Sequence, residues 1–89
     1  INIKLDEGAQ HQLIKKLQKE AKFEGSLEVI MIDGLRVEYK NGFGLIRASN
    51  TTPVIVLRFE ADAPDMLEKI KDQFREVLSK YLPINQITF

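Results

Sequence analysis

The chain has 89 residues, 44% of them hydrophobic and 29% charged, which is the composition of one small folded domain rather than of a disordered segment. Its 13 basic and 13 acidic residues cancel, which argues against a surface for nucleic acid or anionic membranes because such surfaces need a basic excess. The lack of cysteine excludes disulfides and thiolate zinc sites, no apolar run is long enough to cross a membrane, and we expect a cytoplasmic protein.

The N-terminal part predicts a strand followed by a helix. Ile1–Leu5 alternates apolar and polar residues as a half-buried strand does. Asp6 is the expected N-cap of an amphipathic helix that ends before Gly25. Its apolar stripe consists of Ala9, Leu13, Ile14, Leu17 and Ala21, within the range 7–22. Because the strand pattern starts at once and the first residue is not Met, we expect a piece of a longer protein.

The middle of the chain predicts four successive strands. Their ranges are Leu27–Ile32, Leu35–Tyr39, Phe43–Ala48 and Val54–Glu60. Hairpin turns are expected at Asp33-Gly34 and Asn41-Gly42, and a longer polar turn joins the last two strands. The strand from Val54 is apolar as far as Arg58, so we expect it to be the most central one.

The C-terminal part predicts a second amphipathic helix, with Asp62 as N-cap and Pro83 as its end. Its apolar stripe consists of Leu67, Ile70, Phe74, Val77 and Tyr81. The tail Ile84–Phe89 is expected to pack loosely. The order β-α-β-β-β-β-α, with one apolar stripe on each helix, predicts an α+β fold in which both helices lie on one face of an antiparallel sheet.

The turn that begins at Arg47 carries donors suited to a phosphate. The guanidinium of Arg47 can hold two oxygens at once, and Ser49, Asn50 and Thr51 add hydroxyl and amide donors. Ala48 leaves the approach uncrowded, and the N–H groups of a turn can form an anion-binding concavity. The same residue types also favour ordinary polar turns, so the composition alone leaves both interpretations open.

Other candidate residues carry little chemistry. His11 has no second histidine or cysteine beside it and is interpreted as a surface residue of the first helix. Arg58 is expected to pair with Glu38 or Glu60. Two glycines around Phe43 are expected to serve turn geometry, and both methionines to lie in or beside the core. The glycines are Gly42 and Gly44, and the methionines Met31 and Met66. We expect no catalytic residue and no metal ligand in this chain.

The ordered string formed by residues 33–39, 42–53 and 56–61 resembles the last domain of the α-D-phosphohexomutases, and within them it is most similar to bacterial phosphomannomutase/phosphoglucomutase. The resemblance implies a TATA-binding-protein-like fold and a substrate-phosphate site made by Arg47, Ala48, Ser49, Asn50 and Thr51. It also implies that residues 1–89 are the C-terminal domain of a four-domain enzyme that interconverts hexose 1-phosphates and hexose 6-phosphates of mannose and glucose.

The same resemblance implies that the parent enzyme uses magnesium and a hexose 1,6-bisphosphate activator, whereas this domain holds no cofactor and the isolated chain is inactive. The expected partners are a phosphosugar and the other domains, without nucleic acid or membrane. A free-standing domain that senses a small anion is the alternative. A nucleic-acid-binding module is disfavoured, because Tyr39 and Phe43 are the only aromatic candidates and the charge is zero.

Overall fold

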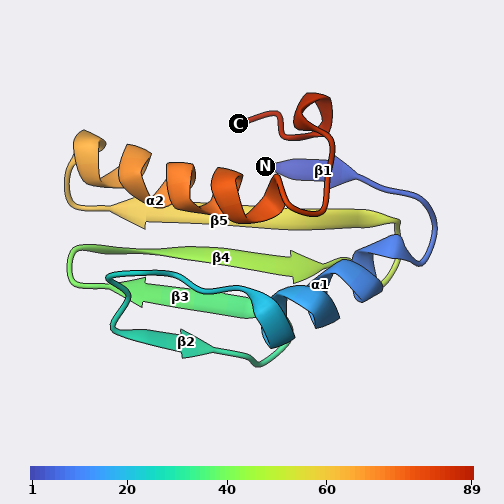
Figure 1. The fold of residues 1–89 in the computed structure, drawn as a ribbon, viewed down its shortest axis with the longest axis horizontal. Helices are drawn as coiled ribbons and strands as arrows, with labels where there is room; N and C mark the ends of the chain where they lie inside the picture. The colour runs from blue at the N-terminus through green and yellow to red at the C-terminus, as the bar shows by residue number, and fades with distance from the viewer.

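Alternating apolar residues build a five-stranded antiparallel sheet in the computed structural model, which describes residues 1–89 (Figure 1). The strands are β1 (Asn2–Lys4), β2 (Glu28–Ile30), β3 (Leu35–Tyr39), β4 (Gly42–Ala48) and β5 (Val54–Ala61), in the spatial order β1-β5-β4-β3-β2. The helices are α1 (Ala9–Glu20), α2 (Pro64–Leu78) and a short 3-10 helix η1 (Ile84–Gln86). The predicted element order is therefore confirmed.

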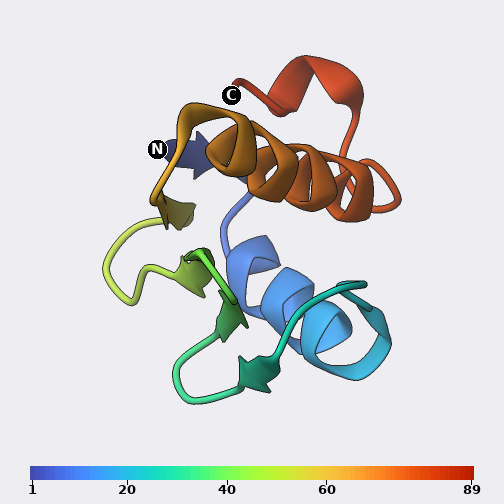
Figure 2. The ribbon, with the colours of Figure 1, turned by 90° about the vertical axis from the view of Figure 1, so that its left-hand side faces the viewer.

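Both long helices lie on the same face of the sheet, as the end-on view in Figure 2 shows, and the other face is open. The inward residues of alternate strand positions meet the apolar stripes of α1 and α2 in one core. This core includes Leu17, Leu35, Ile55 and Phe74, each exposed by 1% or less. The α+β prediction, with two helices on one face of an antiparallel sheet, is confirmed.

Several predictions about helix caps, turn position and strand order are wrong. Neither Asp6 nor Asp62 caps a helix with its side chain, because α1 starts after Gly8 in a left-handed conformation and α2 starts after an extended Ala63. The second hairpin turn lies one residue earlier than predicted, since Tyr39 pairs with Gly42. The middle strand of the sheet is β4 rather than β5, because β3 and β2 lie beyond β4 whereas only β1 lies beyond β5.

The two glycines of β4 serve close packing rather than turn geometry. Gly44 is buried inside the strand, and a Cβ there would lie 2.4 Å from Cε1 of Phe74. A Cβ on Gly42 would lie 2.4 Å from the carbonyl oxygen of Glu60 on β5. Both glycines therefore provide room, Gly44 for the aromatic ring of α2 and Gly42 for the backbone of the neighbouring strand.

Strand β2 and the C-terminal tail also differ from the prediction. The predicted strand Leu27–Ile32 pairs over only three residues, and Met31 is 49% exposed instead of lying at the core. The C-terminal tail folds back and is not loose: the ring of Phe89 lies 5.3 Å from that of Phe59, and its carbonyl accepts a hydrogen bond of 2.5 Å from Nε of Arg75. Aromatic contact and a charged donor hold this end in place.

Candidate functional site

The polar turn between β4 and β5 is fixed by backbone hydrogen bonds at both of its ends. The N–H of Ser49 donates to the carbonyl of Val54 at 2.9 Å, and the N–H of Val54 donates to the carbonyl of Thr52 at 2.8 Å. The carbonyl of Pro53 accepts from the N–H of Leu5 at 2.8 Å, which joins the turn to the segment after β1. The turn is therefore an ordered part of the fold.

The hydroxyl of Ser49 organises the inside of this turn. Its oxygen accepts hydrogen bonds from the N–H groups of Thr51 and Thr52, both at 3.3 Å, and from the Thr52 hydroxyl at 3.1 Å. Three donors therefore converge on one small volume, while the N–H of Asn50 has no acceptor in the protein. The Ser49 hydroxyl thus occupies these donors, and the N–H of Asn50 is the donor of the turn that stays free.

Arg47 differs from the other arginines of the chain in having no carboxylate partner. Arg36 pairs with Glu38 at 2.5 Å. Arg58 pairs with Glu60 at 2.9 Å, which is one of the two partners predicted for it from the sequence. Arg75 contacts two acids of α2. Arg47 is exposed near the end of β4, opposite Val56, and its guanidinium is free to bind an external anion.

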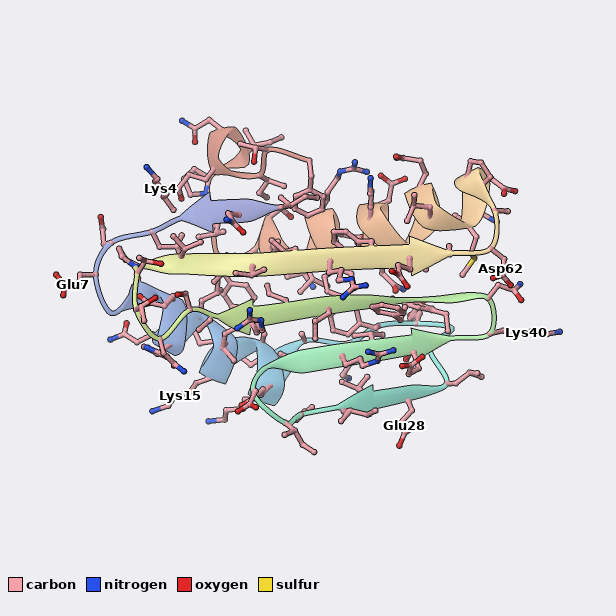
Figure 3. The ribbon with its side chains drawn as sticks, turned by 180° about the vertical axis from the view of Figure 1, so that it is seen from behind. Lys4, Glu7, Lys15, Glu28, Lys40 and Asp62 are labelled. Atoms are coloured by element: carbon pink, nitrogen blue, oxygen red, sulfur yellow. The ribbon has the colours of Figure 1, made fainter.

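A cleft of about 570 Å³ lies between α1 and this end of the sheet, and we call it the α1 cleft. Its lining comprises His11, Ile14, Lys15, Gln18, Asp33, Gly34, Arg47, Ala48 and Asn50. Figure 3 places Lys15 at the end of the sheet where β4 ends and β5 begins. Of the predicted phosphate contacts, Arg47, Ala48 and Asn50 line the α1 cleft, whereas Ser49 and Thr51 lie on the adjoining turn and not in the lining.

The loop after β2 reaches the α1 cleft only because Gly34 has no side chain. Its φ is 133°, and a Cβ there would lie 2.2 Å from the carbonyl oxygen of Ile46 and 3.0 Å from Cα of Arg47. The side-chain amide of Gln18 on α1 donates to the Gly34 carbonyl at 2.9 Å. The backbone of Gly34 therefore packs directly against the backbone of β4 at Ile46 and Arg47.

A second glutamine of α1 holds the polar turn. Nε2 of Gln10 donates to the carbonyl of Thr52 at 3.2 Å and to that of Ser49 at 3.5 Å, and Gln10 is 6% exposed. Sequence patterns missed both glutamines and Lys15, because their neighbours in space lie far along the chain. A glutamine or lysine on a helix ordinarily marks a solvated face, so no local signal identified them.

The remaining ionisable groups include no cluster suited to a metal ion. Burial raises the pKa of Tyr39 to about 12, and its hydroxyl donates to Oε1 of Gln73, away from the α1 cleft. No three His, Asp or Glu side chains gather where they could hold a metal ion, so the chain does not fit a magnesium site. Neither helix has the length and apolar character needed to cross a membrane.

The phosphoglucomutase/phosphomannomutase C-terminal domain family matches residues 1–77. The chain belongs to this family. A phosphoglucomutase from Neisseria meningitidis serogroup B is 57% identical over 79 residues, 88% of the chain, and a phosphomannomutase/phosphoglucomutase from Pseudomonas putida is 48% identical over all 89 residues. The crystal structure of a phosphoglucomutase/phosphomannomutase family protein from Burkholderia thailandensis matches 93% of the chain with a TM-score of 0.81 and 52% identity.

These relatives are much longer than the chain. It spans 17% of the Neisseria and Burkholderia proteins and 19% of the Pseudomonas protein. The match therefore identifies one domain type of an isomerase family, and it confirms the resemblance found in the sequence.

Proposed function

We propose that this chain is the substrate-phosphate-binding domain of a phosphohexomutase, an enzyme that interconverts hexose 1-phosphates and hexose 6-phosphates of mannose and glucose by phosphoryl transfer. Arg47, Ala48, Ser49, Asn50 and Thr51 contact the phosphate. The observation that carries the proposal is the unpaired guanidinium of Arg47 beside the free N–H of Asn50. A partner-free cation at the end of β4 and a free backbone donor on the turn that follows it suit a phosphate dianion.

The α1 cleft supplies the setting for this contact. Lys15 and Arg47 oppose a single lining acid, Asp33, so the cleft has an excess of positive charge although the whole chain is neutral. Its volume of about 570 Å³ lies within the range of small-molecule sites. A phosphosugar could therefore place its phosphate on the turn and its ring over the cleft.

In this proposal the chain binds and orients, and phosphoryl transfer takes place on other domains of the parent enzyme. This chain offers no cluster of acids for magnesium, and that role is assigned to the rest of the enzyme. A hexose 1,6-bisphosphate would place whichever phosphate is not reacting on the turn. The contact is thus common to both sugars and to both reaction directions.

A phosphate titration of the ¹⁵N-labelled chain tests the proposal. We expect amide shifts confined to residues 47–52 and a dissociation constant of about 1 mM, because exposed charge pairs contribute little in water. Arg47→Ala should remove the shifts, whereas Arg36→Ala should retain them, since Arg36 is already paired with Glu38. Absence of shifts in the wild-type chain would contradict the proposal. A micromolar constant would instead favour a free-standing anion sensor.

A further inference from the structure

We propose that Gln10 is a positioning residue for the phosphate-binding turn, and that its side-chain amide directs the N–H of Asn50 toward the ligand. The inference rests on the proposed phosphate-binding function of the turn. Gln10 is the second residue of α1 and is 6% exposed. Its amide donates to the carbonyls of Ser49 and Thr52, which lie on either side of Asn50 and Thr51.

The chemistry of the partners settles the orientation of this amide. Both neighbours are carbonyl oxygens, at 3.2 Å for Thr52 and 3.5 Å for Ser49, so the NH₂ group must face them and the amide oxygen must face away. The two N–H donors on this one nitrogen allow Gln10 to hold both carbonyls at once. A glutamate of the same size would place a carboxylate oxygen against the carbonyl oxygens of Ser49 and Thr52, and these atoms would repel one another.

The carbonyl of Ser49 and the N–H of Asn50 belong to one peptide unit. In a trans peptide these two groups point in opposite directions. When Gln10 draws the Ser49 carbonyl toward the buried side of the turn, it turns the Asn50 N–H toward the outside. That N–H has no acceptor in the protein and lies on a residue that lines the α1 cleft with Arg47.

The amide also leaves a buried atom without a partner. Oε1 of Gln10 is buried and accepts no hydrogen bond from the protein. An unpaired buried acceptor lowers stability, and the hydrogen bonds of the Gln10 NH₂ group to the carbonyls of Ser49 and Thr52 offset that loss. A local loss of stability of this kind is typical of residues retained for function. The two N–H donors of Gln10 are what the position requires.

Phosphate titration of two variants of the chain tests the role. Gln10→Met keeps the length and helix propensity of the side chain but removes both donors, and Gln10→Glu replaces the donor nitrogen with a charged oxygen. Gln12→Met and Gln12→Glu are matched controls, because Gln12 is exposed on the same helix and lines a different cleft. The probe is inorganic phosphate, and the readouts are the dissociation constant and the phosphate-induced shift of the Asn50 amide.

We expect Gln10→Met to raise the dissociation constant about 3- to 10-fold, as the loss of about one net hydrogen bond does, and to shrink the Asn50 shift. Gln10→Glu should raise it further, and both Gln12 variants should match the wild-type chain. If Gln10→Glu does not fold, the dissociation constant and Asn50 shift of Gln10→Met alone test the inference.

Wild-type affinity and an unchanged Asn50 shift in a folded Gln10→Met chain would overturn the inference while the proposed function stood. An equal loss in the Gln12 variants would also overturn it. A wild-type chain without any phosphate-induced shift would overturn both.

Discussion

At the scale of the residue, pairing decides which arginine can bind a ligand. Arg36, Arg58 and Arg75 are each satisfied by an acid of their own strand or helix, so an external anion would have to displace a carboxylate that is already in place. Arg47 has no such competitor, so an anion that binds it has no carboxylate to displace. Its register position near the end of β4 brings it beside the turn donors.

Arg47→Ala in the parent enzyme is therefore expected to lower kcat/KM about 10- to 150-fold, the effect of losing about 1.5–3 kcal/mol of charge-assisted hydrogen bonding. Arg47→Lys should recover only part, because an ammonium lacks the planar fork. The measurement is kcat/KM for mannose and glucose phosphates in both directions. A loss limited to one sugar would show that Arg47 contacts a hydroxyl instead of the phosphate.

Lys15→Met should weaken phosphate binding by the isolated chain by about two- to fivefold, because an exposed charge at the edge of the site acts through water. Lys19→Met is the matched control, since Lys19 is an exposed lysine of the same helix outside the cleft lining. Titrations at low and at high salt should show the Lys15 contribution fading as the charge is screened. Equal effects of both variants would indicate a general charge effect without a role for the α1 cleft.

The raised pKa of Tyr39 predicts that the chain loses stability at high pH. Burial raises its pKa to about 12 from the ordinary value of 10.0, so the folded state keeps its proton where the unfolded state loses it. The contribution is complete below about pH 10 and disappears as the pH rises through about 12. The free energy of unfolding in urea should fall over this window more steeply for the wild-type chain than for Tyr39→Phe. Parallel curves would contradict the assignment.

At the scale of the element, β4 connects the core to the site. Its inward side carries Gly44 beneath the ring of Phe74, and its end carries Arg47 and Ala48 in the lining of the α1 cleft. The packing of α2 on β4 thus sets the plane of the strand whose end lines the α1 cleft. The α1 cleft itself is built by α1 and the two loops at this end of the sheet, which Gln10 and Gln18 hold.

Gly44→Ala should lower the free energy of unfolding by about 1–3 kcal/mol, as overpacking of a closed core does. The added Cβ would lie 2.4 Å from Cε1 of Phe74, so one of the two elements must move. Phe74→Leu should relieve the clash, and the double variant should lose less stability than the sum of the single variants. Additive losses in urea unfolding would show that the two positions do not meet.

The sequence predicted the elements because each has a complete hydrophobic period. It marked Arg47 to Thr51 as a candidate site because the suitable donors lie in one continuous run, and that site stays a prediction. It failed where the outcome depends on contacts across the sheet. Gly44 carries no mark in the sequence that distinguishes a turn residue from one placed under a ring. Gln10 acquires its role only when the turn, 39 to 42 residues away, folds against α1. The tail was misjudged because Phe89 finds its aromatic partner in β5.

At the scale of the whole molecule, the chain has the dimensions of an independent domain. Its radius of gyration is 12.3 Å, close to the value of about 12 Å for a compact domain of this length. One core joins residues of four strands and both long helices, so we regard the chain as a single cooperative unit. The Ser49–Pro53 turn and the α1 cleft lie at one end of this unit, open to solvent, where other domains of a longer enzyme could close over them.

The purified chain is expected to have no mutase activity, even when magnesium and a hexose 1,6-bisphosphate are supplied. Phosphoryl transfer needs a group that carries the phosphoryl and charges that stabilise its transfer, and in the proposed function this chain only holds a phosphate that is not reacting. A coupled assay that follows conversion of glucose 1-phosphate to glucose 6-phosphate measures this directly. The Arg47→Ala chain is the control for contaminating host mutase, because a contaminant would be unaffected by the substitution. Turnover that persists through purification and disappears in Arg47→Ala would show that the chain catalyses the reaction itself, and the assignment of transfer to other domains would be wrong.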